Sequence, residues 1–187
     1  MKRPNIVIFN PDSWRGEAAG YSGNKIIRTP HLDALAAEGT GFTNAFAQSP
    51  VCVPSRCSFM TGWYPHVRGH RTMHHMLSPE EPELLKELKN SGYQVWWGGK
   101  NDMVRLEDEK NHCHIRFDAP EDHRGEFYSK VRKPGSKHFY THYEGKLPYE
   151  YAYFRDDGNV DGAVEFLKSK PTEPFCLVLT LSLPHCP

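Results

Sequence analysis

Four short apolar segments, placed far apart along the chain, constrain its fold more than any other feature. They span residues 5–9, 41–47, 93–97 and 175–183. Apolar runs of this length are typical of strands, and the long intervals between them are typical of parallel strands joined by crossover helices. The sequence therefore predicts an α/β domain in which helices flank a mostly parallel sheet on both faces.

Helical patterns lie between these segments. The expected helices span residues 30–38, 54–61, 79–90 and 159–168, with Thr29 as the N-cap of the first. Residues 102–157 are different, because they are rich in His, Lys, Arg, Tyr and Gly and show no sustained periodicity. We expect this stretch to be an irregular insertion across one end of the domain.

Charge and composition argue against several classes of protein. The 23 Lys and Arg residues balance the 23 Asp and Glu residues, so no net charge would draw the chain to nucleic acid or to a membrane surface. No apolar run approaches the roughly 20 residues of a membrane span. The five cysteines show neither a disulfide framework nor paired metal-ligand spacing. We therefore expect a cytoplasmic domain with reduced thiols.

Polar residues that are capable of chemistry follow each apolar segment. They are Asp12, residues 52–56, Lys100 and His185. In open parallel sheets, ligands bind beyond the carboxyl ends of the strands. Because these groups follow four different segments, the sequence predicts that they converge at one edge of the sheet.

The most specific pattern is Cys-Val-Pro-Ser-Arg-Cys-Ser-Phe-Met-Thr-Gly at residues 52–62. A side chain at the start of a helix lies near exposed amides and the positive end of the helix dipole, which favour bound anions and lower the pKa of a thiol. Arg56, one turn further on, would offer a planar cation suited to an oxyanion. We therefore expect Cys52 to be a reactive group.

This pattern resembles the signature of the sulfatase family, Cys-x-Pro-Ser-Arg followed by Thr-Gly, in which the cysteine is converted after translation to formylglycine. The resemblance continues in the segments at residues 4–12, 29–39, 91–100 and 183–187. It therefore runs through nearly the whole chain in the family's order. It implies the N-terminal portion of an alkaline-phosphatase-like sulfatase domain.

The resemblance also implies a reaction, the hydrolysis of sulfate esters. The hydrated formylglycine at position 52 would attack sulfur as the alcohol leaves, and its second hydroxyl would then expel sulfate. Ca²⁺, or alternatively Mg²⁺, would be bound by Asp12 and by the residue derived from Cys52. Lys100 and His185 would bind the sulfate oxygens, and one of them would protonate the leaving group. Arg56 would hold position 52.

The implied partners are a formylglycine-generating maturation enzyme and a small aryl or carbohydrate sulfate ester. His70, which belongs to a dense group of histidines after the signature, is a further expected contact to that substrate. No nucleic-acid or membrane partner is expected.

The sequence departs from the family pattern in three places. Ser13 stands where the family often has a second aspartate, and Asp102 stands where it typically has a histidine two residues after the lysine. The chain also ends at Pro187, before the strands that carry the family's second pair of metal ligands. We therefore expect residues 1–187 to be the N-terminal part of the catalytic domain, which by itself binds the metal poorly and is inactive.

Two alternative functions stay open at this point. The same nucleophile and cation serve phosphoryl transfer, so hydrolysis of phosphonate or phosphate esters is the nearer alternative. The other alternative is a non-catalytic binding fragment that keeps the fold without the activity. A thiol at position 52 that is never converted to formylglycine would favour the non-catalytic fragment.

Overall fold

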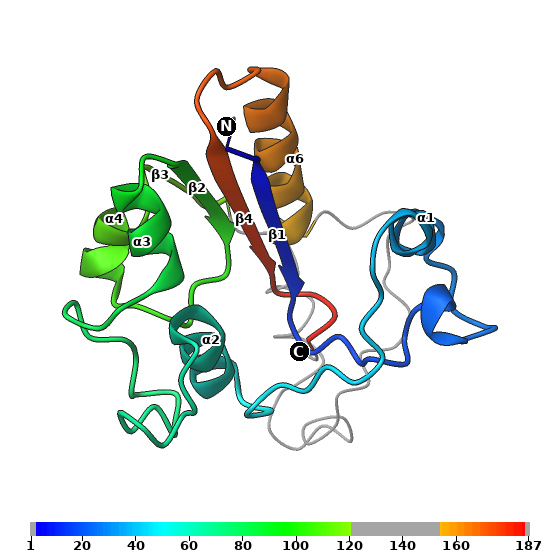
Figure 1. Cartoon of the computed structure of the whole chain (residues 1–187), viewed down its shortest axis with the longest axis horizontal. Coiled ribbons are helices and arrows are strands. Elements are labelled where there is room, and N and C mark those ends of the chain that lie inside the picture. Colours follow the sequence, from blue (N-terminus) through cyan, green and yellow to red (C-terminus); the bar gives the residue numbers. More distant parts are fainter. Residues whose placement is uncertain (1–2, 121–153, 186–187) are drawn as a thin grey trace, which may run out of the picture.

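The fold is built on one parallel sheet (Figure 1). A computed structural model describes residues 3–120 and 154–185. Within these residues the sheet has the strand order β1-β4-β2-β3, and all three neighbouring pairs are parallel. The strands are β1 (Ile6–Pro11), β2 (Gln94–Gly99), β3 (Ile115–Phe117) and β4 (Phe175–Leu181). The predicted parallel sheet is confirmed.

Strand β4 lies between β1 and β2 and is buried along its whole length. This burial explains why its sequence is a continuous apolar run and does not alternate. The last residues of β1 and β2 pair with adjacent residues of β4, Leu181 and Thr180. The residues that follow these two strands, Asp12 and Lys100, therefore start from the same edge of the sheet.

Helices cover both faces of the sheet, as predicted (Figure 1). The first face carries α2 (Cys52–Thr61), α3 (Leu84–Asn90) and α4 (Glu109–His112), and the second carries α6 (Arg155–Lys168). Successive residues of a strand point to opposite faces, so Trp97 packs with α2 and α3 whereas Trp96 packs with α6. Several large apolar side chains are buried on each face of the sheet. Burying each of them contributes roughly 1.5–3 kcal/mol to the stability of the fold.

Helix α1 (Pro30–Glu38) lies outside these layers and packs on the short helix η1 (Gly20–Ser22). No residue of α1 is buried. Thr29, the expected N-cap, makes no capping hydrogen bond to the helix. Its hydroxyl instead donates to Asp33 and accepts from the backbone amide of Gly20, so it ties α1 to η1.

The structure differs most from the expected elements in two places, and it also starts α6 at Arg155, four residues before the expected residue 159. Residues 41–47 form no strand, and their alternating Phe42 and Phe46 are 77% and 79% exposed. An alternating pattern gives a strand only where a neighbour offers hydrogen bonds, and none of the described strands lies beside this segment. Helix α3 begins at Leu84 and not at residue 79, because the Glu83 carboxylate caps it by accepting from the amides of residues 85 and 86.

The stretch that was expected to be irregular contains regular structure at its start. Strand β3 and helix α4 lie there, together with the short helix η2 (Leu106–Asp108). Three residues of strand are too few to show periodicity in a sequence. Residues 121–153, which are most of the expected insertion, lie outside the described residues, as do residues 186–187. In the described part of the chain, no helix is both long and apolar enough to cross a lipid bilayer.

Candidate active site

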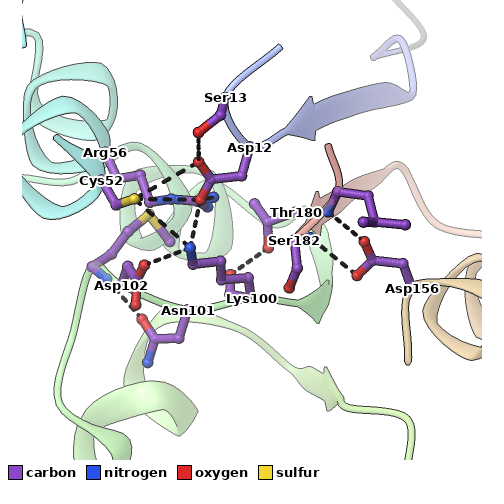
Figure 2. Close-up of polar contacts among 12 residues, drawn as sticks. Asp12, Ser13, Cys52, Arg56, Lys100, Asn101, Asp102, Asp156, Thr180 and Ser182 are labelled. Carbon is purple, nitrogen blue, oxygen red and sulfur yellow. Dashed lines mark hydrogen bonds and ion pairs between the residues drawn. The ribbon is translucent and has the colours of Figure 1, made fainter. Parts of the chain in front are cut away.

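Asp12 is the centre of a polar cluster at the carboxyl ends of the strands (Figure 2). Its backbone N–H donates to the carbonyl of Leu181 (3.1 Å), which holds it against the end of β4. Its side chain is 7% exposed. The hydroxyl of Ser13 donates to Asp12 Oδ1 (3.0 Å), so Ser13 orients the carboxylate.

Helix α2 presents two residues to this carboxylate. Cys52 is the first residue of the helix, and its Sγ lies 3.4 Å from Asp12 Oδ2. Arg56, four residues later and therefore on the same side of the helix, places Nη2 3.3 Å from the same oxygen. Val53 and Cys57, each one residue further on, lie about 100° round the helix from Cys52 and Arg56. They pack in the core, which fixes the rotation of the helix.

One atom of Arg56 is left without a partner. Its Nη1 is buried and makes no hydrogen bond within the described residues. Buried N–H groups in proteins are almost always paired, so this donor beside the cavity has room for a partner that the described protein groups do not supply, either water or a ligand.

Lys100 reaches the cluster from the end of β2. Its Nζ donates to Asp12 Oδ2 (2.6 Å) and lies 3.7 Å from Cys52 Sγ. It also pairs with Asp102 Oδ2 at 3.1 Å. Figure 2 shows the ammonium between the two carboxylates, with the sulfur beside it. These five residues, Asp12, Cys52, Arg56, Lys100 and Asp102, are called the rim cluster below.

The backbone around Lys100 is fixed by Gly99 and Thr180. Gly99 has a φ of +87°, and a Cβ there would lie 2.0 Å from the carbonyl oxygen of Thr180, so only glycine fits. The Lys100 N–H donates to that carbonyl (2.7 Å), and the Thr180 hydroxyl donates to the Lys100 carbonyl (2.6 Å). The Trp97 indole N–H donates to the same hydroxyl (3.1 Å).

His185 arrives beside the rim cluster from the segment that follows β4. Among the described residues, Asp12, Cys52 and His185 have ligand atoms that all lie within 4.8 Å of one another. The backbone N–H of His185 donates to the carbonyl of Ser182 (3.0 Å), which turns this segment back toward the cluster. The structure thus brings together Asp12, Cys52, Lys100 and His185, whose chemical roles stay predictions.

The charges of the cluster stabilise one another. Burial alone would raise the pKa of Asp12, but the hydrogen bond and charge of Lys100, with Ser13 and Arg56, outweigh it and lower that pKa to about 2. Burial alone would lower the pKa of Lys100, and the carboxylates of Asp12 and Asp102 instead raise it. Both groups are therefore charged at neutral pH.

The thiol of Cys52 behaves differently from the prediction. Burial raises its pKa, and the nearby carboxylates of Asp12 and Asp102 raise it further, against the opposing charge of Lys100. The expected lowering of this pKa by the helix start is therefore wrong. Burial was the largest missing factor, followed by the two carboxylates, since the sequence alone showed neither the burial of the thiol nor how close the carboxylates would lie.

The same atoms offer part of a shell for a hard cation. Ca²⁺ takes about six to eight oxygen ligands. Asp12 supplies a carboxylate, and the Sγ of Cys52 lies where the oxygens of a formylglycine residue would be. Lys100 and Arg56 compete for the same carboxylate oxygen. The described residues therefore fit a cation as part of its shell and not as the whole of it.

A cavity of about 390 Å³ opens beside the cluster. Asp12, Cys52 and Arg56 line it, together with the aromatic side chains of Trp14 and Phe59. A larger cavity of about 610 Å³ lies elsewhere, around Gly92 and residues 169–173, but the rim cluster does not line it. The chemistry of the lining and not the volume therefore identifies the candidate site.

His70 does not belong to this cluster. It is buried, its Nδ1 is 2.7 Å from the carbonyl oxygen of His75, and its Nε2 is 3.1 Å from Oε1 of Glu81. Both ring nitrogens are thus occupied by protein groups. The structure places this histidine in a buried pair, and its expected contact to the substrate stays a prediction.

Sequence reasoning missed two residues that support the site. Thr180 is the one hydroxyl-bearing residue in β4, and that isolated polar position was a usable signal. Asp156 is buried at the start of α6 and bonds to the segment that carries His185. No local pattern distinguishes it from the neighbouring Asp157, so the sequence alone did not reveal it.

Comparison with known proteins places the chain in a family. A family model described as Sulfatase matches residues 4–187. An ulvan-active sulfatase from Formosa agariphila is 33% identical over 196 residues, which cover 99% of this chain and 36% of that protein. The chain spans about a third of the length of the curated relatives that it matches.

Solved structures share the fold. A structure described as a 2-O GAG sulfatase has a TM-score of 0.71 and 24% identity, with 98% of this chain and 36% of that chain covered. The phosphonate monoester hydrolase of Agrobacterium radiobacter has a TM-score of 0.67 and 22% identity, with 98% and 41% covered. At these identities the likeness shows the fold alone, and that fold serves more than one kind of ester.

Proposed function

The chain belongs to the sulfatase family, and we propose that it contributes to the hydrolysis of sulfate esters at the rim cluster. One observation carries this proposal. Asp12, Cys52 and Lys100 come from three distant segments and meet within hydrogen-bonding distance beside a cavity. His185 joins them from a fourth segment.

Cys52 acts in this proposal after conversion to formylglycine. Because its pKa is raised, the thiol stays protonated at neutral pH and is a poor thiolate nucleophile. Once converted and hydrated, position 52 supplies hydroxyl groups as the nucleophile. The low pKa of Asp12 keeps a carboxylate beside that position at neutral pH.

The cations of the cluster bind the negative charge of the ester. Lys100 and His185 face position 52 and would hold the sulfate oxygens, and one of them would protonate the departing alcohol. The unpaired Nη1 of Arg56 is a ready donor to an oxygen of the converted residue.

A hard divalent cation is the proposed cofactor, with Ca²⁺ preferred over Mg²⁺ because it accepts a larger and less regular shell. Asp12 and the oxygen of the converted Cys52 would hold it. When bound, the cation supplies positive charge that polarises the sulfate oxygens. The other ligands would come from outside the described residues.

The proposed substrate is a small sulfate ester, carried by a carbohydrate or an aryl alcohol. The relative from Formosa agariphila is named for activity on ulvan, and the fold neighbour is named as a sulfatase of GAG. Hydrolysis of a phosphonate ester is the alternative, favoured by the likeness to the phosphonate monoester hydrolase.

We further propose that residues 1–187 form the N-terminal part of a catalytic domain. Strand β1 lies at an edge of the described sheet, and its Val7 and Phe9 are 59% and 49% exposed. Such apolar side chains at an open edge are normally covered by more protein. Residues 1–187 alone would then bind the metal poorly and turn over little substrate.

Mass spectrometry and turnover together test these proposals. The chain is expressed with a formylglycine-generating enzyme, both as residues 1–187 and as the full reading frame that encodes it. Conversion of Cys52 lowers the intact mass by about 18 Da, and a Cys52→Ala control lacks this shift. Aryl sulfate turnover above aryl phosphonate turnover by the full protein supports a sulfatase.

Three other outcomes would each contradict a different part of the proposed function. Faster phosphonate turnover selects the alternative substrate, and a thiol that stays unconverted favours a non-catalytic fragment. Turnover of aryl sulfate by residues 1–187 alone contradicts the proposal that they are inactive.

A further inference from the structure

Asp156 holds the backbone of the segment that follows β4. It lies in the first turn of α6, and its side chain is buried. Oδ1 accepts from the backbone N–H of Ser182 (3.0 Å), and Oδ2 accepts from that of Leu183 (2.7 Å). Figure 2 shows the carboxylate beside Ser182, across from the rim cluster.

These two bonds fix a segment that has left the sheet. Strand β4 ends at Leu181, which is its last residue paired with β1. The N–H groups of Ser182 and Leu183 are therefore no longer held by the sheet, and the carboxylate takes both. Hydrogen bonds from N–H groups to an ionised carboxylate are shorter and stronger than bonds between neutral groups.

Asp156 lies on a helix that is packed firmly on the sheet. Helix α6 packs on β2 and β4 through Ala163 and Phe166, and Asp157, at the third position of the helix, accepts from the N–H of Phe154. Asp156 thus joins the fixed helix to the segment that carries the site. A carboxylate held on a helix is a better anchor than one on a loop.

His185 depends on this anchor. Its backbone N–H donates to the carbonyl of Ser182, whose own N–H is held by Asp156. A shift of Ser182 would therefore move His185 relative to Asp12 and Cys52, which lie with it in one group. Displacement of a catalytic group by about 1 Å can cost on the order of 100-fold in rate.

We propose that Asp156 is a positioning residue for His185. The role of His185 in this statement rests on the proposed function. In this proposal Asp156 bonds to the backbone and not to the substrate or to position 52. It acts through the two backbone amides and keeps the imidazole aimed at position 52.

The test is the substitution Asp156→Asn, which keeps the shape and one acceptor oxygen but removes the charge and one hydrogen bond. Asp157→Asn is the matched control, because it changes a neighbouring acidic residue of the same helix that does not bond to Ser182 or Leu183. In the full-length converted protein, we expect Asp156→Asn to lower kcat on an aryl sulfate by about 10- to 100-fold with little change in KM. Asp157→Asn should change kcat less than about threefold.

A double-mutant cycle separates positioning from general damage. If Asp156 acts through His185, then Asp156→Asn should cost less than about twofold in a His185→Ala background. An equal loss in both backgrounds overturns the proposal, as does an Asp156→Asn variant with unchanged kcat. Asp156→Glu is the second variant if Asp156→Asn does not fold.

Nuclear magnetic resonance of residues 1–187 keeps the test independent of activity. The ring signals of His185, assigned with His185→Ala, should move in Asp156→Asn and stay in place in Asp157→Asn. If the full protein hydrolyses no sulfate ester but these signals move, the proposed function fails and the anchoring of His185 stands. If they do not move, the anchoring fails whatever the reaction is.

Discussion

Two groups of buried ionisable side chains in the described part of the chain differ in what completes their hydrogen bonding. The first is the rim cluster at the carboxyl ends of the strands. The second is a set of two buried histidine–glutamate pairs, His70 with Glu81 and His112 with Glu83, whose glutamates directly precede α3. Both regions contain ionisable side chains, which are the residue types that indicate a functional site in a sequence.

In the histidine–glutamate pairs, protein groups complete the hydrogen bonding. Glu83 accepts from His112 at 2.8 Å and from two backbone amides of α3, and Glu81 accepts from the amide of Ser78 beside its bond to His70. Such pairs hold the protein together, because losing one member leaves the other buried and unpaired.

In the rim cluster the hydrogen bonding is incomplete. Among the residues that the structure describes, none pairs with the buried Nη1 of Arg56. Three residues compete for one oxygen of Asp12, and a cavity opens beside them. The comparison teaches that burial of charge does not identify a functional site. Unused bonding capacity at the edge of a cavity does so.

The largest expected effect is on turnover in the rim cluster. Lys100→Ala should lower kcat/KM on an aryl sulfate by about 100- to 1,000-fold, because it removes a cation from the charge that develops on the ester oxygens. His112→Gln, which keeps a donor and similar size in the other region, should change kcat/KM less than about threefold. Steady-state kinetics of the converted full protein check both values. If Lys100→Ala lowered kcat/KM only slightly, the proposal that the rim cluster takes part in the reaction would be contradicted.

The second effect is on stability, and here the histidine–glutamate pairs should matter more than other positions. His112→Ala should lower the free energy of unfolding by about 1–3 kcal/mol, because Glu83 would lose a partner in a buried place. His31→Ala, at an exposed position, should change it by less than about 0.5 kcal/mol. Urea unfolding of residues 1–187 measures both. Equal values for the two variants would show that the pair contributes nothing to stability.

The smallest effect is on the dependence of stability on pH. The pKa of Asp12 is about 2 in the folded chain, below its ordinary value of 3.8. A lowered pKa stabilises the fold above the unfolded value, and this contribution is lost as pH falls from about 4 through 2. The loss is at most about 2–3 kcal/mol, and Asp12→Asn should show a shallower decline over that range in urea unfolding. Equal slopes would indicate that the ion pairs with Lys100 and Arg56 do not stabilise the fold.

Much of the fold was predictable because buried strands carry a local signal. The continuous apolar runs gave β1, β2 and β4, and the strand-end rule then gave Asp12, Lys100 and His185. The prediction failed where the signal was not local. Residues 41–47 have the alternation of a strand but no described neighbour to pair with, and β3 is too short to show any alternation.

The candidate site shows the same division. The signature around Cys52 indicated where a reactive residue would lie, but it gave the wrong direction for the pKa of the thiol. Burial raises that pKa most, and two carboxylates from other segments raise it further. His70 looked like a candidate by composition, and only its contacts with His75 and Glu81 placed it in a buried pair.

The amino-acid sequence by itself determined the layered α/β fold, the family and the residues that follow each strand. Apolar runs, turn residues and the 52–62 signature are local, so they can be read without coordinates. The tertiary structure alone decided which side chains touch: the single carboxylate shared by Cys52, Arg56 and Lys100, and the anchoring of the His185 segment by Asp156. Distances between segments far apart in sequence set both hydrogen bonds and pKa shifts, and those distances exist only after the chain has folded.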